Sequence, residues 1–164
     1  MKPPMHTESA SEFKDYVVRV NRTAKVVKGG RRFGFSALVV IGNQNGKVGL
    51  GFGKANEVPQ AVQKAIQHAH KNIMIVSRDG VTFPHEVLAR CGASKIWLKP
   101  ATPGTGVIAG AAVRAVLEAA GVKDILTKAH GSTNAVNLTK AVVSALQFLR
   151  SKEEVMALRG VEIK

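Results

Sequence analysis

The chain has 164 residues, with 24 Lys and Arg against 11 Asp and Glu, and a formal net charge of +13 at pH 7. A hydrophobic content of 45% over this length can form one ordinary domain or two small ones, while so large a charge indicates an anionic partner. The single cysteine excludes an internal disulfide, and no apolar run of about eighteen residues predicts a membrane span. We therefore expect a soluble, intracellular protein.

The first part of the chain is a polar arm followed by a basic strand. Residues 1–12 carry prolines and polar residues without periodicity, so we expect a flexible arm. Valines among basic residues predict a strand over residues 13–27. From residue 16 to residue 56 there is no Asp or Glu, but there are eight cations: Arg19, Arg22, Lys25, Lys28, Arg31, Arg32, Lys47 and Lys54. Because unbalanced charge repels itself, nucleic acid is the first partner to expect.

A glycine loop lies between the basic clusters. Gly29 and Gly30 are flanked by cations in Lys25–Arg32, and such a loop can present backbone N–H groups and charge to phosphates. The alternative is a solvated hairpin tip that is basic by chance. The acid-free surroundings favour phosphate contact.

Two further strands follow the loop. Apolar residues alternate over residues 33–41 and again over 48–52, and Asn45-Gly46 between them is suited to a hairpin turn. Gly49, Gly51 and Gly53 leave one face of the returning strand without side chains. A bare face lets another backbone come close, and that backbone could be a packed element or a sugar-phosphate chain.

The remaining pattern predicts an α+β protein of two small α/β-layer domains. A helix capped by Asn56, whose apolar face runs from Val58 to Ile73, completes a β-β-β-α unit over residues 13–76. Residues 77–164 predict β-β-α-β-α: a hairpin over 86–99, a helix that opens at Gly104 and ends at Gly121, a strand over 124–129, and a helix capped by Ser132 or Thr133. This second unit has twelve basic and seven acidic residues from residue 76 onward, so we expect binding mainly in the first.

One segment matches the sequence motif of a dinucleotide-binding site. Gly104, Gly106 and Ala109 satisfy G-x-G-x-x-A, and Asp124 follows about twenty residues on. The context argues against it, because a proline-containing segment separates the preceding strand from the first glycine. The glycines then serve tight packing, or bind an anion or a protein partner. We expect no catalytic residue and no cofactor, because no nucleophile, base and orienting acid occur together. We also expect no metal site, since no histidine has a Cys or carboxylate at ligand spacing.

Four segments carry a resemblance. Asn21–Phe33, Gly46–Pro59, Pro103–Gly110 and Ala129–Asn134 closely resemble the bacterial small-subunit ribosomal protein S5 family, and the similarity covers nearly the whole chain. It implies a first domain like a double-stranded-RNA-binding fold without its leading helix, and a second domain with a left-handed β-α-β crossover. It makes the eight cations, with Gly29 and Gly30, the expected contacts to small-subunit rRNA.

The resemblance also implies a location and neighbours. These are the junction of head and body in the small subunit of a cytoplasmic ribosome, beside proteins S4 and S8 and near the path by which mRNA enters. The loop from Arg22 to Arg32 would approach the decoding region and the spectinomycin site. Gly104, Thr105, Gly106 and Arg114 would face S4, where changes affect translational accuracy. The alternative is a stand-alone RNA-binding protein that acts outside the ribosome.

Overall fold

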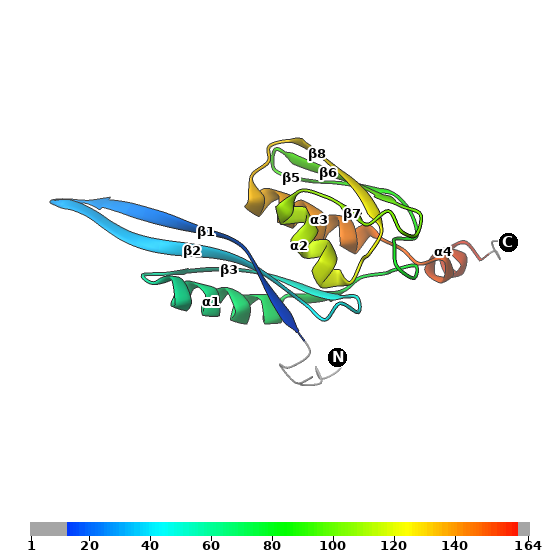
Figure 1. Ribbon diagram of the computed structural model, residues 1–164, viewed down its shortest axis with the longest axis horizontal. Helices are drawn as coiled ribbons and strands as arrows, with labels where there is room; N and C mark the ends of the chain where they lie inside the picture. The colour runs from blue at the N-terminus through cyan, green and yellow to red at the C-terminus, as the bar shows by residue number, and fades with distance from the viewer. Residues whose placement is uncertain (1–12, 161–164) are drawn as a thin grey trace.

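The computed structural model describes residues 13–160, so the arm expected over residues 1–12 lies outside the described residues. The chain forms four stacked layers: helix α1, a first β-sheet, helices α2 and α3, and a second β-sheet (Figure 1). Two domains, one rich in β-structure and one α/β, confirm the α+β class.

The first sheet is antiparallel throughout, with strand order β1-β2-β3-β4. The first domain consists of β1 (Lys14–Val27), β2 (Gly30–Gly42), β3 (Lys47–Ala55), α1 (Val58–Lys71) and β4 (Ile73–Ile75). The predicted β-β-β-α order is present, and β4 is an addition. The sequence pattern placed Ile73 on the helix, which was wrong: α1 ends at Lys71, and Ile73 pairs with Gly49 at the free edge of β3. Asn56 is not the cap either, because Glu57 occupies that position and makes no side-chain capping bond.

The bare face of β3 packs against a helix. A Cβ atom built on Gly49, Gly51 or Gly53 would overlap the backbone oxygens of α1. On the helix, the facing residues are the buried alanines at positions 61, 65 and 69, one helical turn apart. Small residues on both sides therefore let α1 lie directly on the sheet, which decides between the two alternatives for this face in favour of a packed element.

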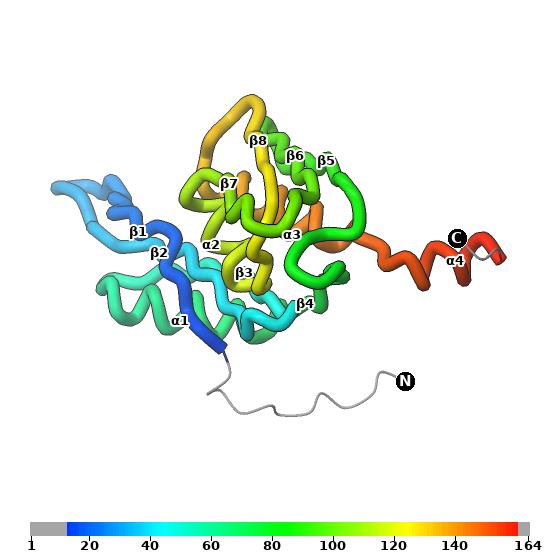
Figure 2. Tube along the Cα trace, turned by 45° about the vertical axis from the view of Figure 1, so that its right-hand side comes forward, coloured from blue at the N-terminus to red at the C-terminus, as the bar shows by residue number. Residues whose placement is uncertain are grey.

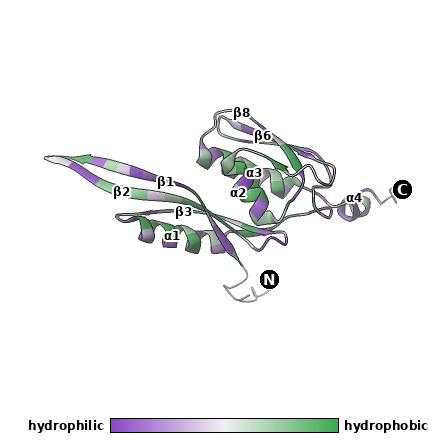
Figure 3. Ribbon diagram, in the orientation of Figure 1, coloured by the Kyte–Doolittle hydropathy of each residue, from purple (hydrophilic) through white to green (hydrophobic). Residues whose placement is uncertain are grey.

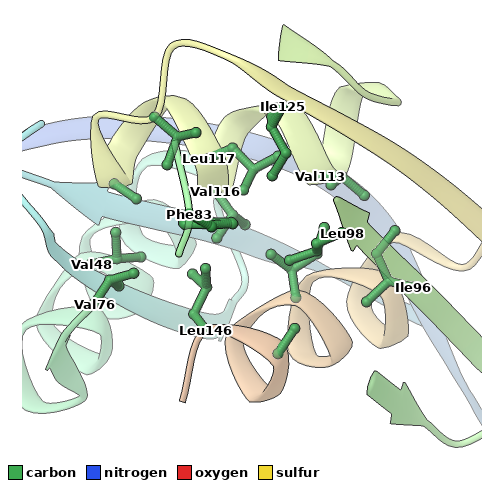
Figure 4. Packing of buried hydrophobic residues seen from close by; sticks show 14 of the residues in the cluster. Val48, Val76, Phe83, Ile96, Leu98, Val113, Val116, Leu117, Ile125 and Leu146 are labelled. Atoms are coloured by element: carbon green, nitrogen blue, oxygen red, sulfur yellow. The ribbon is translucent and has the colours of Figure 1, made fainter. Parts of the chain in front are cut away.

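The opposite face of the first sheet contributes to a core that spans both domains. Val40 and Val48 belong to the same buried cluster as residues of α2, α3 and the second sheet. Figure 4 shows Val48 and Val76 pointing toward the side of the core that holds Phe83 and Leu146. Burial on both faces explains why β2 is apolar at consecutive positions from Ala37 to Ile41.

The second sheet has strand order β5-β6-β8-β7, and β7 and β8 are parallel. Its domain comprises β5 (Val87–Cys91), β6 (Ser94–Pro100), β7 (Val107–Ile108), α2 (Ala111–Ala120), β8 (Ile125–Gly131), α3 (Ala135–Phe148) and α4 (Lys152–Arg159). The predicted order β-β-α-β-α is present, with β7 and α4 added. The parallel strands β7 and β8, joined through α2, form a β-α-β unit, and the left-handed crossover that the resemblance implies for this domain stays a prediction.

Two predicted details of this domain were wrong. The helix does not open at Gly104, because β7 intervenes and α2 begins at Ala111. The cap of α3 is Asn134, whose side-chain oxygen accepts a hydrogen bond from the backbone N–H of Val136 at 2.9 Å. Ser132 instead accepts a hydrogen bond from the backbone N–H of Asn134 through its hydroxyl oxygen.

Backbone hydrogen bonds join the two domains at one corner. The turn between β2 and β3 donates from Gln44 N–H to the Ala119 oxygen and from Gly46 N–H to the Ala120 oxygen, both at 3.0 Å. Arg78, in the connecting segment, donates to Asn45 Oδ1 at 2.8 Å and to the Gly121 oxygen at 3.5 Å. The corner holds the second domain against the turn end of the first sheet and leaves the other end, where β1 and β2 are joined, free (Figure 2).

Candidate nucleic-acid interface

The end of the β1–β2 hairpin projects beyond the rest of the protein (Figure 1). β3 pairs with β2 only from Phe35 to Gly42, so the two strands beyond Phe35 have only each other. We call residues 22–34 the distal hairpin. Five of the predicted contact cations are in it, and all five side chains are exposed: Arg22, Lys25, Lys28, Arg31 and Arg32. Hydrophilic bands mark this part of the hairpin in Figure 3.

Strand pairing distributes these cations over both faces of the hairpin. Lys25 lies directly opposite Arg32 in the β1–β2 register, so their side chains share one face. The two-residue period of β2 places Arg31 on the other face, with Phe33, and Arg22 is on that face too, opposite Phe35. The hairpin therefore presents positive charge in two opposite directions.

On one face an arginine is ordered by an aromatic ring. The guanidinium carbon of Arg22 lies 3.9 Å from the centre of the Phe33 ring, which is cation–π geometry. Phe33 is 51% exposed, so the pair is available at the surface. A guanidinium that lies over a ring does not use its N–H groups for that contact, so they can still donate to phosphate oxygens.

A groove on the hairpin brings the other face together with β3. The groove has a volume of about 570 Å³ and is lined by charged, apolar and backbone groups. Lys25, Arg32 and Lys54 line it, together with Phe33 and Phe35. These three cations, distant in sequence, thus share one concave surface of the first domain.

The hairpin turn depends on its two glycines. Gly29 and Gly30 have φ angles of 93° and 151°, which residues with a side chain rarely adopt. A Cβ atom on either glycine would meet nothing within 4 Å, so the requirement is conformational and not steric. Both positions therefore favour glycine, and contact of the tip with phosphate stays a prediction.

Two of the predicted contact residues lie apart from the distal hairpin. Lys47 starts β3 at the turn end of the sheet, opposite Ile75, and Arg32 is ten residues from that end of β2, roughly 30 Å away along the strand. Arg19 lies beside the second domain, in a shallow pocket of ≈ 370 Å³ that it lines with Asn21 and residues 132–136. The structure therefore gathers Lys54 with the distal hairpin and separates Lys47 from it.

The glycine loop of the second domain already holds an anionic group of the protein. Oδ1 of Asp124 accepts hydrogen bonds from the backbone N–H groups of Gly104 at 3.0 Å and Gly106 at 2.8 Å. Asp124 is buried, and the φ angles of the glycines are 91° and 78°. The Asp124 carboxylate occupies the backbone donors that a phosphate would need. The segment that matches the dinucleotide motif is therefore a loop closed by the protein's own acid, and the prediction that these amides bind an external anion is wrong.

The other residues expected at a protein interface are at the surface. Thr105 donates its hydroxyl hydrogen to the Thr102 oxygen at 2.8 Å, which folds the loop on itself. Arg114 is exposed on α2, and its Nη2 donates to the Val107 oxygen at 3.3 Å. Gly104, Thr105, Gly106 and Arg114 thus lie around the short strand β7.

The sequence pattern missed a second group of cations. It assigned binding mainly to the first domain, but pairing in the second sheet also brings Arg90, Lys95, Lys99 and Lys128 to one exposed face. These residues are scattered over three strands, and no local pattern marks them. The spacing of four residues between Lys95 and Lys99 in β6, which is two strand periods, was the one available signal.

Other kinds of site find no support in residues 13–160. Within that range no three His, Cys, Asp or Glu side chains are grouped so that they could hold a metal ion. None of the helices described there is long and apolar enough to cross a membrane.

Comparison with protein families gives two matches, one to each domain. The model described as "Ribosomal protein S5, N-terminal domain" matches residues 13–77. The model described as "Ribosomal protein S5, C-terminal domain" matches residues 89–159. Together the two matches cover the first sheet, the four helices of residues 13–160, and the second sheet except the first two residues of β5.

Proposed function

Because the chain belongs to the ribosomal protein S5 family, whose members are structural proteins of the small ribosomal subunit and bind rRNA, we propose that the distal hairpin makes its main contacts to the rRNA backbone. The observation that carries this proposal is the hairpin's charge. Its five exposed cations are on a two-stranded projection, in a stretch from residue 16 to residue 56 without a single carboxylate side chain. Phosphate groups supply the negative charge that the protein does not.

The shape of the hairpin suggests how it binds. Lys25 and Arg32 point to one side and Arg22 and Arg31 to the other, so a hairpin inserted between two RNA segments contacts phosphates on both. Phosphate contacts fix position without reading bases, which suits a protein that holds folded RNA by its shape. Arg19, Lys47 and Lys54, with the tip glycines Gly29 and Gly30, complete the proposed rRNA contacts.

The finer assignments are also proposals, supported by the resemblance of the motifs. Residues 13–76 form the rRNA-binding unit, and residues 77–164 form a unit that contacts rRNA and neighbouring proteins. The protein lies at the head–body junction of the cytoplasmic ribosome, beside S8 and near incoming mRNA and the spectinomycin site. Gly104, Thr105, Gly106 and Arg114 face S4 and influence translational accuracy; the exposure of Gly104 and Arg114 supports this role.

Photocrosslinking tests the position of the hairpin. Lys28 and Arg31 are each replaced by a photoreactive residue in translating cells, with Lys64, exposed on α1, as the control position. We expect crosslinks from positions 28 and 31 to small-subunit rRNA, and few from position 64. Crosslinks spread over unrelated RNAs would instead support a stand-alone RNA-binding protein, as would loss of the protein from small subunits during a high-salt wash.

Salt dependence tests the mechanism. Replacing Lys25, Lys28, Arg31 and Arg32 by Ala should weaken RNA binding and flatten the plot of log affinity against log salt by about 0.9 for each lost phosphate contact, the value for duplex nucleic acid. Lys64→Ala with Lys71→Ala is the control on α1. An unchanged slope in the hairpin variant would show that these side chains do not touch phosphate.

A further inference from the structure

The second sheet has a face that no element of the described chain covers. Its buried side chains point toward α2 and α3, and the alternate residues of β5, β6 and β8 point outward (Figure 1). We call this outward surface the outer sheet face. Its exposed side chains are Leu88, Arg90, Lys95, Trp97, Lys99, Leu126, Lys128 and His130.

Strand pairing collects the charges of this face into one patch. Lys95 on the middle strand β6 lies between Arg90 and His130, and Trp97 lies between Leu88 and Lys128. The strands β5, β6, β7 and β8 contain three Lys and one Arg but no Asp or Glu. The nearest acids in sequence are Glu86, just before β5, and Asp124, just before β8, and Asp124 is buried and bonded to Gly104 and Gly106. An uncompensated basic sheet face complements a polyanion and repels a basic protein.

A tryptophan stands in the middle of the patch. Trp97 is the only Trp of the chain, and 39% of it is exposed. Nζ of Lys99 lies 5.9 Å from the centre of its ring. An exposed aromatic ring surrounded by cations offers a stacking surface for a base together with partners for the adjoining phosphates.

We propose that the outer sheet face binds single-stranded RNA, with a base stacked on Trp97 and the flanking phosphates contacted by Lys95 and Lys128. A paired RNA helix fits less well, because its bases are stacked on one another and its major groove is too narrow to admit this face. The site is separate from the distal hairpin, which belongs to the other domain (Figure 2). The protein would then bind two RNA segments: the hairpin would contact the phosphates of one, and the outer sheet face would bind an unpaired base of the other.

The single tryptophan allows a direct test. The fluorescence of Trp97 is measured while the full-length protein is titrated with an oligouridine of about twelve nucleotides, a length typical of sites that bind single-stranded nucleic acid. An RNA duplex of equal length is titrated for comparison. We expect saturable quenching by the single strand and much weaker quenching by the duplex. The variant with Lys25, Lys28, Arg31 and Arg32 replaced by Ala should show the same quenching, which separates this proposal from the one for the hairpin.

Variants identify the groups involved, with binding followed by the anisotropy of labelled oligouridine in the hairpin-variant background. Trp97→Ala should weaken binding roughly 5- to 150-fold, the loss expected for one stacked base, whereas Trp97→Phe should keep most of the affinity. Lys95→Ala with Lys128→Ala should lower the salt slope by about 0.7 per phosphate contact. The control, Lys64→Ala with Lys71→Ala, should change neither.

Three results would overturn the proposal. One is no quenching by oligouridine in a protein that still binds rRNA through its hairpin. The second is equal quenching by the duplex, which would exclude stacking of an unpaired base. The third is a change in Trp97 fluorescence only when other small-subunit proteins are added, which would make this face a protein interface.

Discussion

The backbone oxygen of Ala65 occupies the space that a side chain on Gly51 would need. We expect Gly51→Ala to lower the free energy of unfolding by at least about 1–3 kcal/mol, because a methyl group between the backbones of β3 and α1 would push the helix away from the sheet. Urea denaturation followed by circular dichroism measures the loss. Gly110→Ala is the control, since a Cβ there meets nothing within 4 Å and its φ is −66°. Equal losses in the two variants would contradict this account of the packing.

Lys25 and Arg32 are directly opposite each other in the hairpin, and both are exposed. Like charges in this position destabilise a strand pair, so Lys25→Glu should raise the free energy of unfolding by about 0.2–1 kcal/mol while it weakens RNA binding. The stability gain should shrink at high salt. Lys28→Glu, in the turn, lacks this cross-strand pairing and should lower RNA affinity without the gain. A loss of stability in Lys25→Glu would show that repulsion between the two cations is insignificant.

Asp124 closes the Gly104–Gly106 loop with two hydrogen bonds to its buried carboxylate. Asp124→Ala should cost about 2–3 kcal/mol, since both amide donors lose a charged acceptor. Asp124→Asn retains one acceptor oxygen and should cost less. Hydrogen exchange at Gly104 and Gly106 localises the effect: it should become faster in Asp124→Ala. Unchanged exchange there would mean that other contacts hold the loop.

Arg114 is exposed on α2, in the domain proposed to face S4. Arg114→Glu should alter the frequency of misreading in cells whose only copy carries the change, and it should leave rRNA affinity within about twofold, the change expected for a surface charge remote from phosphate. A readthrough reporter measures accuracy, and filter binding measures affinity. Arg114→Lys, which keeps the charge, serves as the comparison. Loss of rRNA affinity with an intact fold would overturn the assignment to a protein interface.

Leu117 is fully buried in the cluster that also contains Val40 and Val48 of the first sheet. We expect the two domains to unfold together, and Leu117→Ala to destabilise both by about 2–5 kcal/mol. Trp97 fluorescence reports on the second domain, and amide exchange in β2 reports on the first. Leu158→Ala, exposed on α4, is the control. Two separate transitions would contradict a shared core.

The first domain was largely predictable from the sequence because its signals are local. The alternation of β2, the turn at Asn45-Gly46 and the charge of the hairpin each lie within a few consecutive residues. The role of the β3 glycines was not decided by that pattern, because a bare face suits a helix or an RNA backbone equally. Only the three alanines of α1 facing those glycines distinguish the two.

The second domain was less predictable because its features depend on distant pairing. β7 has two residues, too few for a period, and becomes a strand only by pairing with β8. Asp124 was visible in the sequence, but its use as an internal ligand depends on the fold that brings it to Gly104 and Gly106. The outer sheet face is likewise assembled by the register of three strands, whereas composition alone assigned little binding to this domain.

β1 is an edge of its sheet in the described chain and runs for 14 residues. An edge of this length exposes N–H and C=O groups to which another copy could add a strand, the first step toward aggregation. Arg19, Arg22 and Lys25 are placed along it, so two such edges repel each other. We therefore expect these cations also to disfavour edge-to-edge association between free copies of the protein.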